Sequence, residues 1–198
     1  MAWLPRQTMV PTSSTKQRKS TPSVNHRFVR ELRLSELSGH PSEMADLQRV
    51  LDQAPAYAER VTGAPPGRAD AQSMFTILPD GKTYEDKYVF GIYLGSQMVG
   101  CADLIKAYPR PDTVLLGLLL IAEPFQGQGI GSAAYRAIED VIRGWNTCAQ
   151  IRLGVVRTNA EVLPFWTQLG FIETGESKPY RYGPIVSETI ILVKSLLR

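Results

Sequence analysis

The chain has 198 residues, of which 43% are hydrophobic and 21% are charged. This composition is typical of a globular protein rather than a disordered one, and the length predicts one domain with a substantial core. The longest apolar run, Val114 to Ala122, is far shorter than the ~20 residues that a membrane span needs, so we expect no membrane association.

The formal net charge of +3 comes from the N-terminal end of the chain. Arg6, Lys16, Arg18 and Lys19 precede Val24 without any acid, which leaves 18 of the 22 basic residues and all 19 acidic residues for the rest. A nearly neutral body does not attract nucleic acid, so we expect no nucleic-acid partner. Residues 1–25 are interpreted as a flexible basic tail rich in Ser, Thr and Pro, with an organelle transit peptide as the alternative. Residues 26–198 are predicted to form a single domain.

The two cysteines, Cys101 and Cys148, are far apart and form no Cys-x-x-Cys motif. Only His26 and His40 could add soft ligands, so we expect neither a disulfide framework nor a metal site. This cysteine usage favours a reducing compartment, and we expect a cytoplasmic protein.

Taken in chain order, the pattern predicts a mixed α/β fold that starts with a strand over 26–34 and two helical segments over 41–54 and 55–61. A short helix over 71–78 follows, and a glycine-led turn at Gly95-Ser96 indicates a hairpin between strands 87–94 and 98–107. The uniformly apolar segment 113–122 is typical of a central strand. The remaining elements are predicted as a helix over 132–145, a buried strand over 151–156, a helix over 160–169, a strand that starts over 171–174 and a last strand over 186–193.

The segment between the central strand and the helix after it contains glycines at positions 127, 129 and 131. A helix start carries unpaired N–H groups and a partial positive charge, and glycine lets the backbone approach a phosphate closely. We therefore interpret this loop as a diphosphate cradle, with a glycine-rich turn without ligand as the alternative. Gly129-Ile-Gly131-Ser-Ala-Ala134 also matches a dinucleotide fingerprint, but no acid follows the next strand, and no Lys-Ser/Thr pair supports a P-loop.

Two motifs stand on either side of the helix predicted over 132–145. Gln126-x-x-Gly129-x-Gly131 follows the apolar strand, and Asn159 precedes a helix that ends at Gly170-Phe171. Together they resemble the GNAT superfamily of acyl-CoA-dependent N-acyltransferases. The resemblance covers about residues 28–194. It implies a central mixed sheet of about seven strands with helices on both faces, in which strands 113–122 and 151–156 are parallel and splay apart.

The resemblance also implies that acetyl-CoA is bound between the two splayed strands, as co-substrate. Gly117 and Gly154 interrupt these strands and are interpreted as a bulge or a close approach of the backbone, or as an accommodation of bulky neighbours. The implied contacts to acetyl-CoA come from Leu119, Ile121, Gln126, Gly127, Gln128, Gly129, Ile130, Gly131, Ser132, Asn159 and Trp166.

Catalysis would need a base for the acceptor ammonium and an acid for the leaving thiolate. The central strand has no titratable side chain, and Glu123 at its exit is expected to face solvent. Asp103 is therefore our candidate base. The alternative is that Asp103 is a strand-end residue in an ion pair with Lys87 or Lys106. Trp166 occupies the position where the superfamily usually has an acidic tyrosine. Tyr180 and Tyr182, in the predicted loop before the last strand, could serve as the acid, with a binding or surface role as the alternative. Tyr180 is our candidate acid.

These features predict an N-acetyltransferase that transfers the acetyl group of acetyl-CoA to a primary amine by direct attack in a ternary complex. Tyr84, Glu85 and Asp86 could bind a cationic small-molecule amine. The alternatives are a protein or aminoacyl-tRNA acetyltransferase and a non-catalytic acyl-CoA-binding module. A homodimer is compatible with the sequence.

Overall fold

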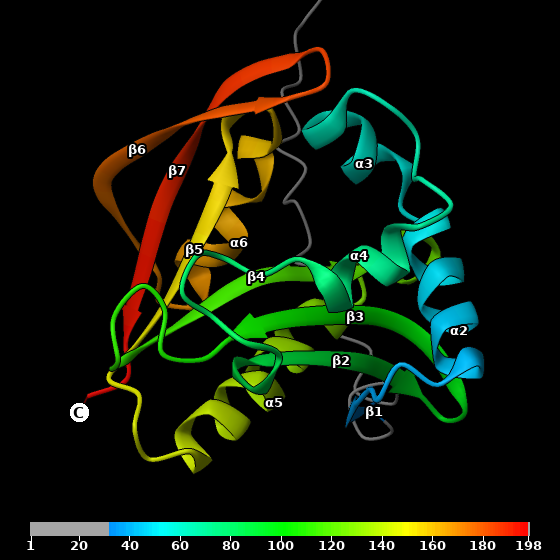
Figure 1. The fold of residues 1–198 in the computed structure, drawn as a ribbon, viewed down its shortest axis with the longest axis horizontal. Coiled ribbons are helices and arrows are strands. Elements are labelled where there is room, and N and C mark those ends of the chain that lie inside the picture. The colour runs from blue at the N-terminus through cyan, green and yellow to red at the C-terminus, as the bar shows by residue number, and fades with distance from the viewer. Residues whose placement is uncertain (1–31, 198) are drawn as a thin grey trace, which may run out of the picture.

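The computed structural model describes residues 32–197, so the predicted tail and the first six residues of the predicted first strand lie outside the described part. The chain forms a mixed α/β fold around one seven-stranded sheet (Figure 1). The strand order is β1-β2-β3-β4-β5-β7-β6, and only β4 and β5 pair in parallel. The predicted fold class is confirmed.

The first half of the sheet is an antiparallel meander. It consists of β1 (Leu32–Glu36), β2 (Lys87–Leu94), β3 (Gln97–Ile105) and β4 (Thr113–Ile121). Between β1 and β2 the chain forms α2 (Pro41–Asp52), α3 (Pro55–Thr62), α4 (Asp70–Thr76) and the short 3-10 helix η1 (Tyr84–Asp86). Apolar residues of α2 and α4, including Leu47 and Met74, pack against one face of the sheet.

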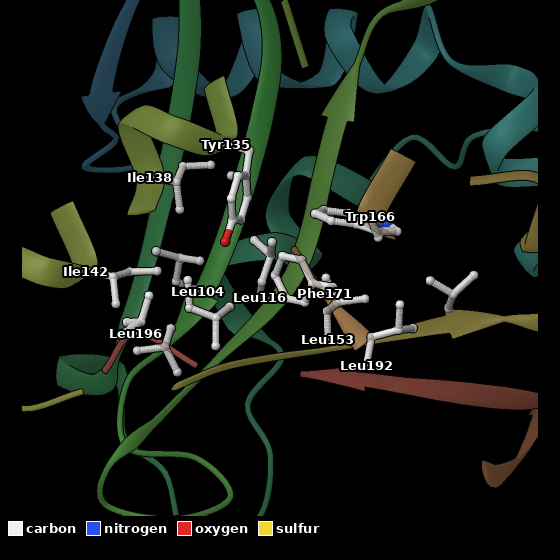
Figure 2. Close-up of a cluster of buried hydrophobic side chains, with 14 of the residues drawn as sticks. Leu104, Leu116, Tyr135, Ile138, Ile142, Leu153, Trp166, Phe171, Leu192 and Leu196 are labelled. Atoms are coloured by element: carbon white, nitrogen blue, oxygen red, sulfur yellow. The ribbon is translucent and has the colours of Figure 1, made fainter. Parts of the chain in front are cut away.

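The second half begins with the parallel crossover. After η2 (Glu123–Phe125), α5 (Ile130–Gly144) leads to β5 (Gln150–Val156), and the chain ends with β6 (Ile172–Tyr182) and β7 (Ile185–Ser195). Tyr135, Ile138 and Ile142 on α5 face the buried leucines of β3, β4, β5 and β7, as Figure 2 shows. The sheet is therefore covered on both faces.

Two elements differ from the sequence-based expectation. The predicted helix over 160–169 is divided into η3 (Arg157–Val162) and α6 (Leu163–Gln168), with non-helical dihedral angles at Asn159. Pro164 stands in the first turn of α6, where its missing N–H is tolerated, and a proline there favours a new helix start.

The second difference is the length of β6, which has 11 residues and includes Tyr180 and Tyr182, so the expected loop before the last strand is wrong. This strand forms one edge of the sheet and is exposed along nearly all its length. Without a buried face it shows no apolar alternation, which is why the sequence pattern indicates only its start.

Candidate active site

The strands β4 and β5 pair only from Thr113 with Gln150 to Leu116 with Leu153, and then diverge. Gly117 lies at the point of divergence. It is the extra residue of a bulge against β3, because Leu104 pairs with Leu116 and Asp103 pairs with Leu118. Gly154, in contrast, is a close approach: a Cβ there would lie 2.5 Å from the Thr189 methyl group. Beyond Leu116 and Leu153 the facing edges of the two strands are open.

A cavity of about 470 Å³ occupies the space between the diverging strands. Most of the residues expected to contact acetyl-CoA line this cavity. They are Leu119, Ile121, Gln126, Gly127, Gly129, Gly131, Ser132, Asn159 and Trp166. Gln128 and Ile130 are not part of the lining: the Gln128 amide donates to the Pro124 carbonyl, and Ile130 is buried in the core.

The glycine loop opens α5 without a side-chain cap. Gly129 is the N-cap residue and has φ +80°, and Gly127 has φ +72°, a backbone conformation that favours glycine. Gln126 fixes the loop from inside, because its amide donates to the Ile121 carbonyl at 2.7 Å. The first N–H groups of a 15-residue helix are thus presented beside the cavity, at the positive end of the helix dipole.

These features fit acetyl-CoA. A diphosphate needs backbone N–H donors that no Cβ screens, and the start of α5 provides them. An extended pantetheine arm has amide groups that can pair with strand edges, and β4 and β5 leave such edges open beyond their last paired residues.

The helix α3 supplies the opposite wall of the cavity through Tyr57, Arg60 and Val61. Burial raises the pKa of Tyr57 to about 12, so its phenol stays protonated at neutral pH. The sequence analysis missed these residues, because a short amphipathic helix carries no signal for the element it packs against. The start of α3 is joined to the exit of β4, where the Glu123 carboxylate accepts a hydrogen bond from the Ala56 N–H at 2.9 Å. Glu123, expected to face solvent, is exposed but also binds α3.

Trp166 contributes to the cavity wall from α6 and is 7% exposed. Its ring packs in edge-to-face contacts against Tyr135, Phe165 and Phe171, at centroid distances of 6.0, 4.9 and 5.3 Å. Figure 2 shows this ring among the buried side chains that connect α5 with the sheet. Trp166 therefore belongs both to the core and to the cavity.

Asp103 forms an ion pair with Lys87, one of the two alternatives left open by the sequence. The Lys87 ammonium lies 2.9 and 3.0 Å from the two carboxylate oxygens, and the side chains are 4% and 18% exposed. Burial raises the pKa of Asp103, although the Lys87 charge and hydrogen bond act in the opposite direction. The carboxylate lies behind the bulge: a Cβ on Gly117, a lining residue, would be 3.2 Å from Asp103 Oδ2.

Neither Asp103 nor the other expected catalytic and acceptor-binding residues are part of the cavity lining. The Tyr180 hydroxyl donates to the Val61 carbonyl at 2.8 Å and so attaches β6 to α3. Tyr84, Glu85 and Asp86 form η1, and the Asp86 carboxylate accepts from the Thr83 N–H and pairs with Lys82. This geometry gives Tyr180 an anchoring contact. The role of Tyr180 as the acid and the binding of the acceptor by Tyr84, Glu85 and Asp86 stay predictions.

Residues 54–171 match the family model described as the acetyltransferase (GNAT) family. This match covers more than half of the chain, which therefore belongs to the GNAT acetyltransferase family, enzymes that transfer the acetyl group of acetyl-CoA to an acceptor. The resemblance found in the sequence is confirmed. No curated protein matches the sequence.

Solved structures show the same fold. An acetyltransferase from Thermus thermophilus has 24% identity and a TM-score of 0.64, with 85% of this chain and 99% of that chain covered. The ribosomal-protein-S18-alanine N-acetyltransferase from Escherichia coli has 16% identity and a TM-score of 0.61, with 84% and 95% covered. An aminoglycoside 6'-N-acetyltransferase complexed with coenzyme A has 14% identity and a TM-score of 0.61, with 84% and 98% covered.

Two features are absent from residues 32–197. No helix in this range is long and apolar enough to cross a membrane. Within the same range, no group of three or more His, Cys, Asp or Glu side chains is placed to hold a metal ion.

Proposed function

We propose that this protein acetylates a primary amine of a small molecule, by direct attack of the amine on acetyl-CoA in a ternary complex. The observation that carries the proposal is the continuity of one cavity from the glycine loop to α3. The same space is lined by Gly129 at the start of α5, by Gly117 beside the Asp103 carboxylate, and by Tyr57 on α3.

The small size of the acceptor is inferred from the contacts that hold α3 across the open side of the splayed strands. Arg60 pairs with Glu161 on η3 at 2.6 Å, and the Thr158 hydroxyl donates to the Arg60 carbonyl at 2.6 Å. Tyr180 on β6 adds its hydrogen bond to Val61. In Figure 1, α3 lies beside the end of the β6–β7 hairpin. A polypeptide acceptor would require a groove here, and we infer that α3, held by these contacts, leaves room for a small amine instead.

Acetyl-CoA, when bound, supplies an acetyl group activated as a thioester. In our proposal the N–H groups at the start of α5 hold the diphosphate, and the open edges of β4 and β5 align the pantetheine arm. Asp103 accepts one proton from the acceptor ammonium, which frees the nitrogen lone pair for attack on the acetyl carbon. The carbon–sulfur bond then breaks, and the CoA thiolate takes the second proton that the nitrogen releases, directly or through water. Lys87 holds the carboxylate in place, and Trp166 forms an apolar wall without an acidic proton.

The proposal is tested by measuring CoA release with a panel of acceptors at saturating acetyl-CoA. The panel contains polyamines, aminoglycosides, amino acids and short peptides with a free N-terminus. We expect turnover with at least one small amine and a mass increase of one acetyl group on its nitrogen. Faster turnover of peptides than of every small amine would contradict the small-molecule acceptor, and no acetyl-CoA binding at all would contradict the function itself.

A further inference from the structure

Asn159 is a buried polar residue, with 8% of its surface exposed. It lines the cavity from η3, at the residue where the dihedral angles depart from helical values. Arg60 approaches it from α3, and the Arg60 Nη1 atom lies 3.3 Å from Asn159 Oδ1. A buried amide beside an arginine is therefore a defined feature of the cavity wall.

The arginine determines which way this amide points. A guanidinium can only donate hydrogen bonds, so the Asn159 oxygen must face Arg60 and the NH₂ group must face the other way. Among residues 32–197 no hydrogen bond from Asn159 Nδ2 is formed. Asn159 Nδ2 is not among the enclosed side-chain atoms that lack a hydrogen-bond partner, so it is accessible. Because the Asn159 side chain lines the cavity, its N–H donors are available to a bound molecule.

We propose that Arg60 is a positioning residue that orients the Asn159 amide so that its NH₂ group donates to a carbonyl oxygen of acyl-pantetheine. This inference rests on the proposed function, because acyl-CoA is the ligand that brings carbonyl acceptors to this part of the cavity. Without the Arg60 contact the amide can rotate and present its oxygen, which repels a carbonyl oxygen. Arg60 thus acts through Asn159.

Arg60 is itself held in place for this task. Its guanidinium pairs with Glu161, and its carbonyl accepts from the Thr158 hydroxyl one residue before Asn159. The Arg60 and Glu161 side chains are 36% and 61% exposed, and an ion pair so exposed contributes little to stability. The consequence of losing Arg60 should therefore appear mainly in ligand binding rather than in folding.

The test measures the Kd of acetyl-CoA by calorimetry, with thermal unfolding of each variant as a check. We expect Arg60→Met to raise the Kd about tenfold, the equivalent of one lost hydrogen bond, and Arg60→Lys to restore part of the affinity. Asn159→Asp separates orientation from folding, because a carboxylate still accepts from Arg60 but has no N–H. It should bind acetyl-CoA at least tenfold more weakly while melting near the wild-type temperature.

A double variant and a matched control complete the test. In an Asn159→Ala background, Arg60→Met should have no further effect on the Kd, because Arg60 acts only through the amide. Arg157→Met removes another ion pair of η3, that with Glu188, at a position outside the cavity lining, and should leave the Kd within twofold of wild type. If wild-type protein binds acetyl-CoA but Arg60→Met does so equally well, or if the two substitutions are additive, the inference is refuted. Absence of binding by wild-type protein would instead refute the proposed function.

Discussion

Replacing Asp103 by Asn removes the group to which we assign the acceptor's proton. Proton transfer to a positioned side chain accelerates a reaction by about 10²–10⁴-fold, so we expect kcat/KM to fall by that factor. This corresponds to a loss of about 3–5 kcal/mol of transition-state stabilisation. The assay is CoA release at saturating acetyl-CoA with the best small amine of the panel.

The pH dependence of the rate tests the assignment of Asp103 as the base independently of how far kcat/KM falls. Only the ionised carboxylate accepts a proton, so the rate should rise with pH through the pKa of Asp103, which burial raises. Lys87→Met removes the charge that lowers this pKa, so the rise in rate should move to higher pH. The free energy of unfolding should change in the opposite direction to the rate. A raised carboxyl pKa in the folded state stabilises the protein at low pH, and this contribution is lost as the pH rises through that pKa.

Loss of stability must be separated from loss of chemistry. Asp103→Asn leaves the Lys87 ammonium, 4% exposed, without its carboxylate, and breaking such a pair costs about 3–5 kcal/mol. The double variant Lys87→Met with Asp103→Asn contains no unpaired charge, so it should recover the melting temperature but not the rate. A double variant that retains more than a tenth of the wild-type kcat/KM, with the same rise at acidic pH, would refute Asp103 as the base.

Three further predictions concern the loop, the aromatic wall and the core. Acetyl-CoA at a hundred times its Kd should raise the melting temperature by about 5–10 °C, and Gly129→Asp should abolish this shift. The control Gly81→Asp, at a similar positive φ but outside the cavity lining, should keep it. Trp166→Phe should keep kcat within about tenfold of wild type with an unchanged pH profile, and Trp166→Ala should lose ~3–5 kcal/mol of stability. A thousandfold fall in kcat for the Phe variant would contradict the interpretation of Trp166 as an apolar wall that donates no proton. Burial raises the pKa of Glu139, but its hydrogen bonds with Lys194 and Arg143 outweigh this and lower it overall. The free energy of unfolding should thus fall as the pH drops below the ordinary glutamate pKa of about 4.3. Urea titrations at several pH values should show a weaker dependence of this free energy on pH for Glu139→Gln than for wild type. An equal dependence in the two proteins would exclude the pairing.

The cofactor half of the candidate site could be predicted from the sequence because its requirements are local. Gly129 needs a positive φ at a helix start, and Gln126 binds a carbonyl five residues earlier, so both act within one short segment. The apolar run from residue 113 to 121 likewise requires burial on both faces, wherever the neighbouring elements lie. Such requirements leave a recognisable pattern in consecutive residues, and the family resemblance rests on them.

The wall of the cavity that α3 forms depends on contacts between distant segments. Arg60 meets Asn159 across 99 residues of chain, and Tyr180 meets the carbonyl of Val61 across 119. Neither contact has a spacing that a sequence pattern could reveal, because the two partners are brought together by the packing of α3 against η3 and β6. The position of Tyr180 was misjudged for a related reason, since an exposed edge strand lacks alternation.

By itself, the sequence determined the order of elements, the central strand and the loop at the start of α5, because backbone dihedral angles and burial periodicity are properties of short stretches. Tertiary structure alone decided that β4 and β5 separate beyond Leu116 and that Lys87 is the partner of Asp103. It also decided that α3 completes the cavity. Each of these depends on which strand edges and side chains meet in space, and pairing partners are selected by the packing of the whole sheet rather than by any one segment.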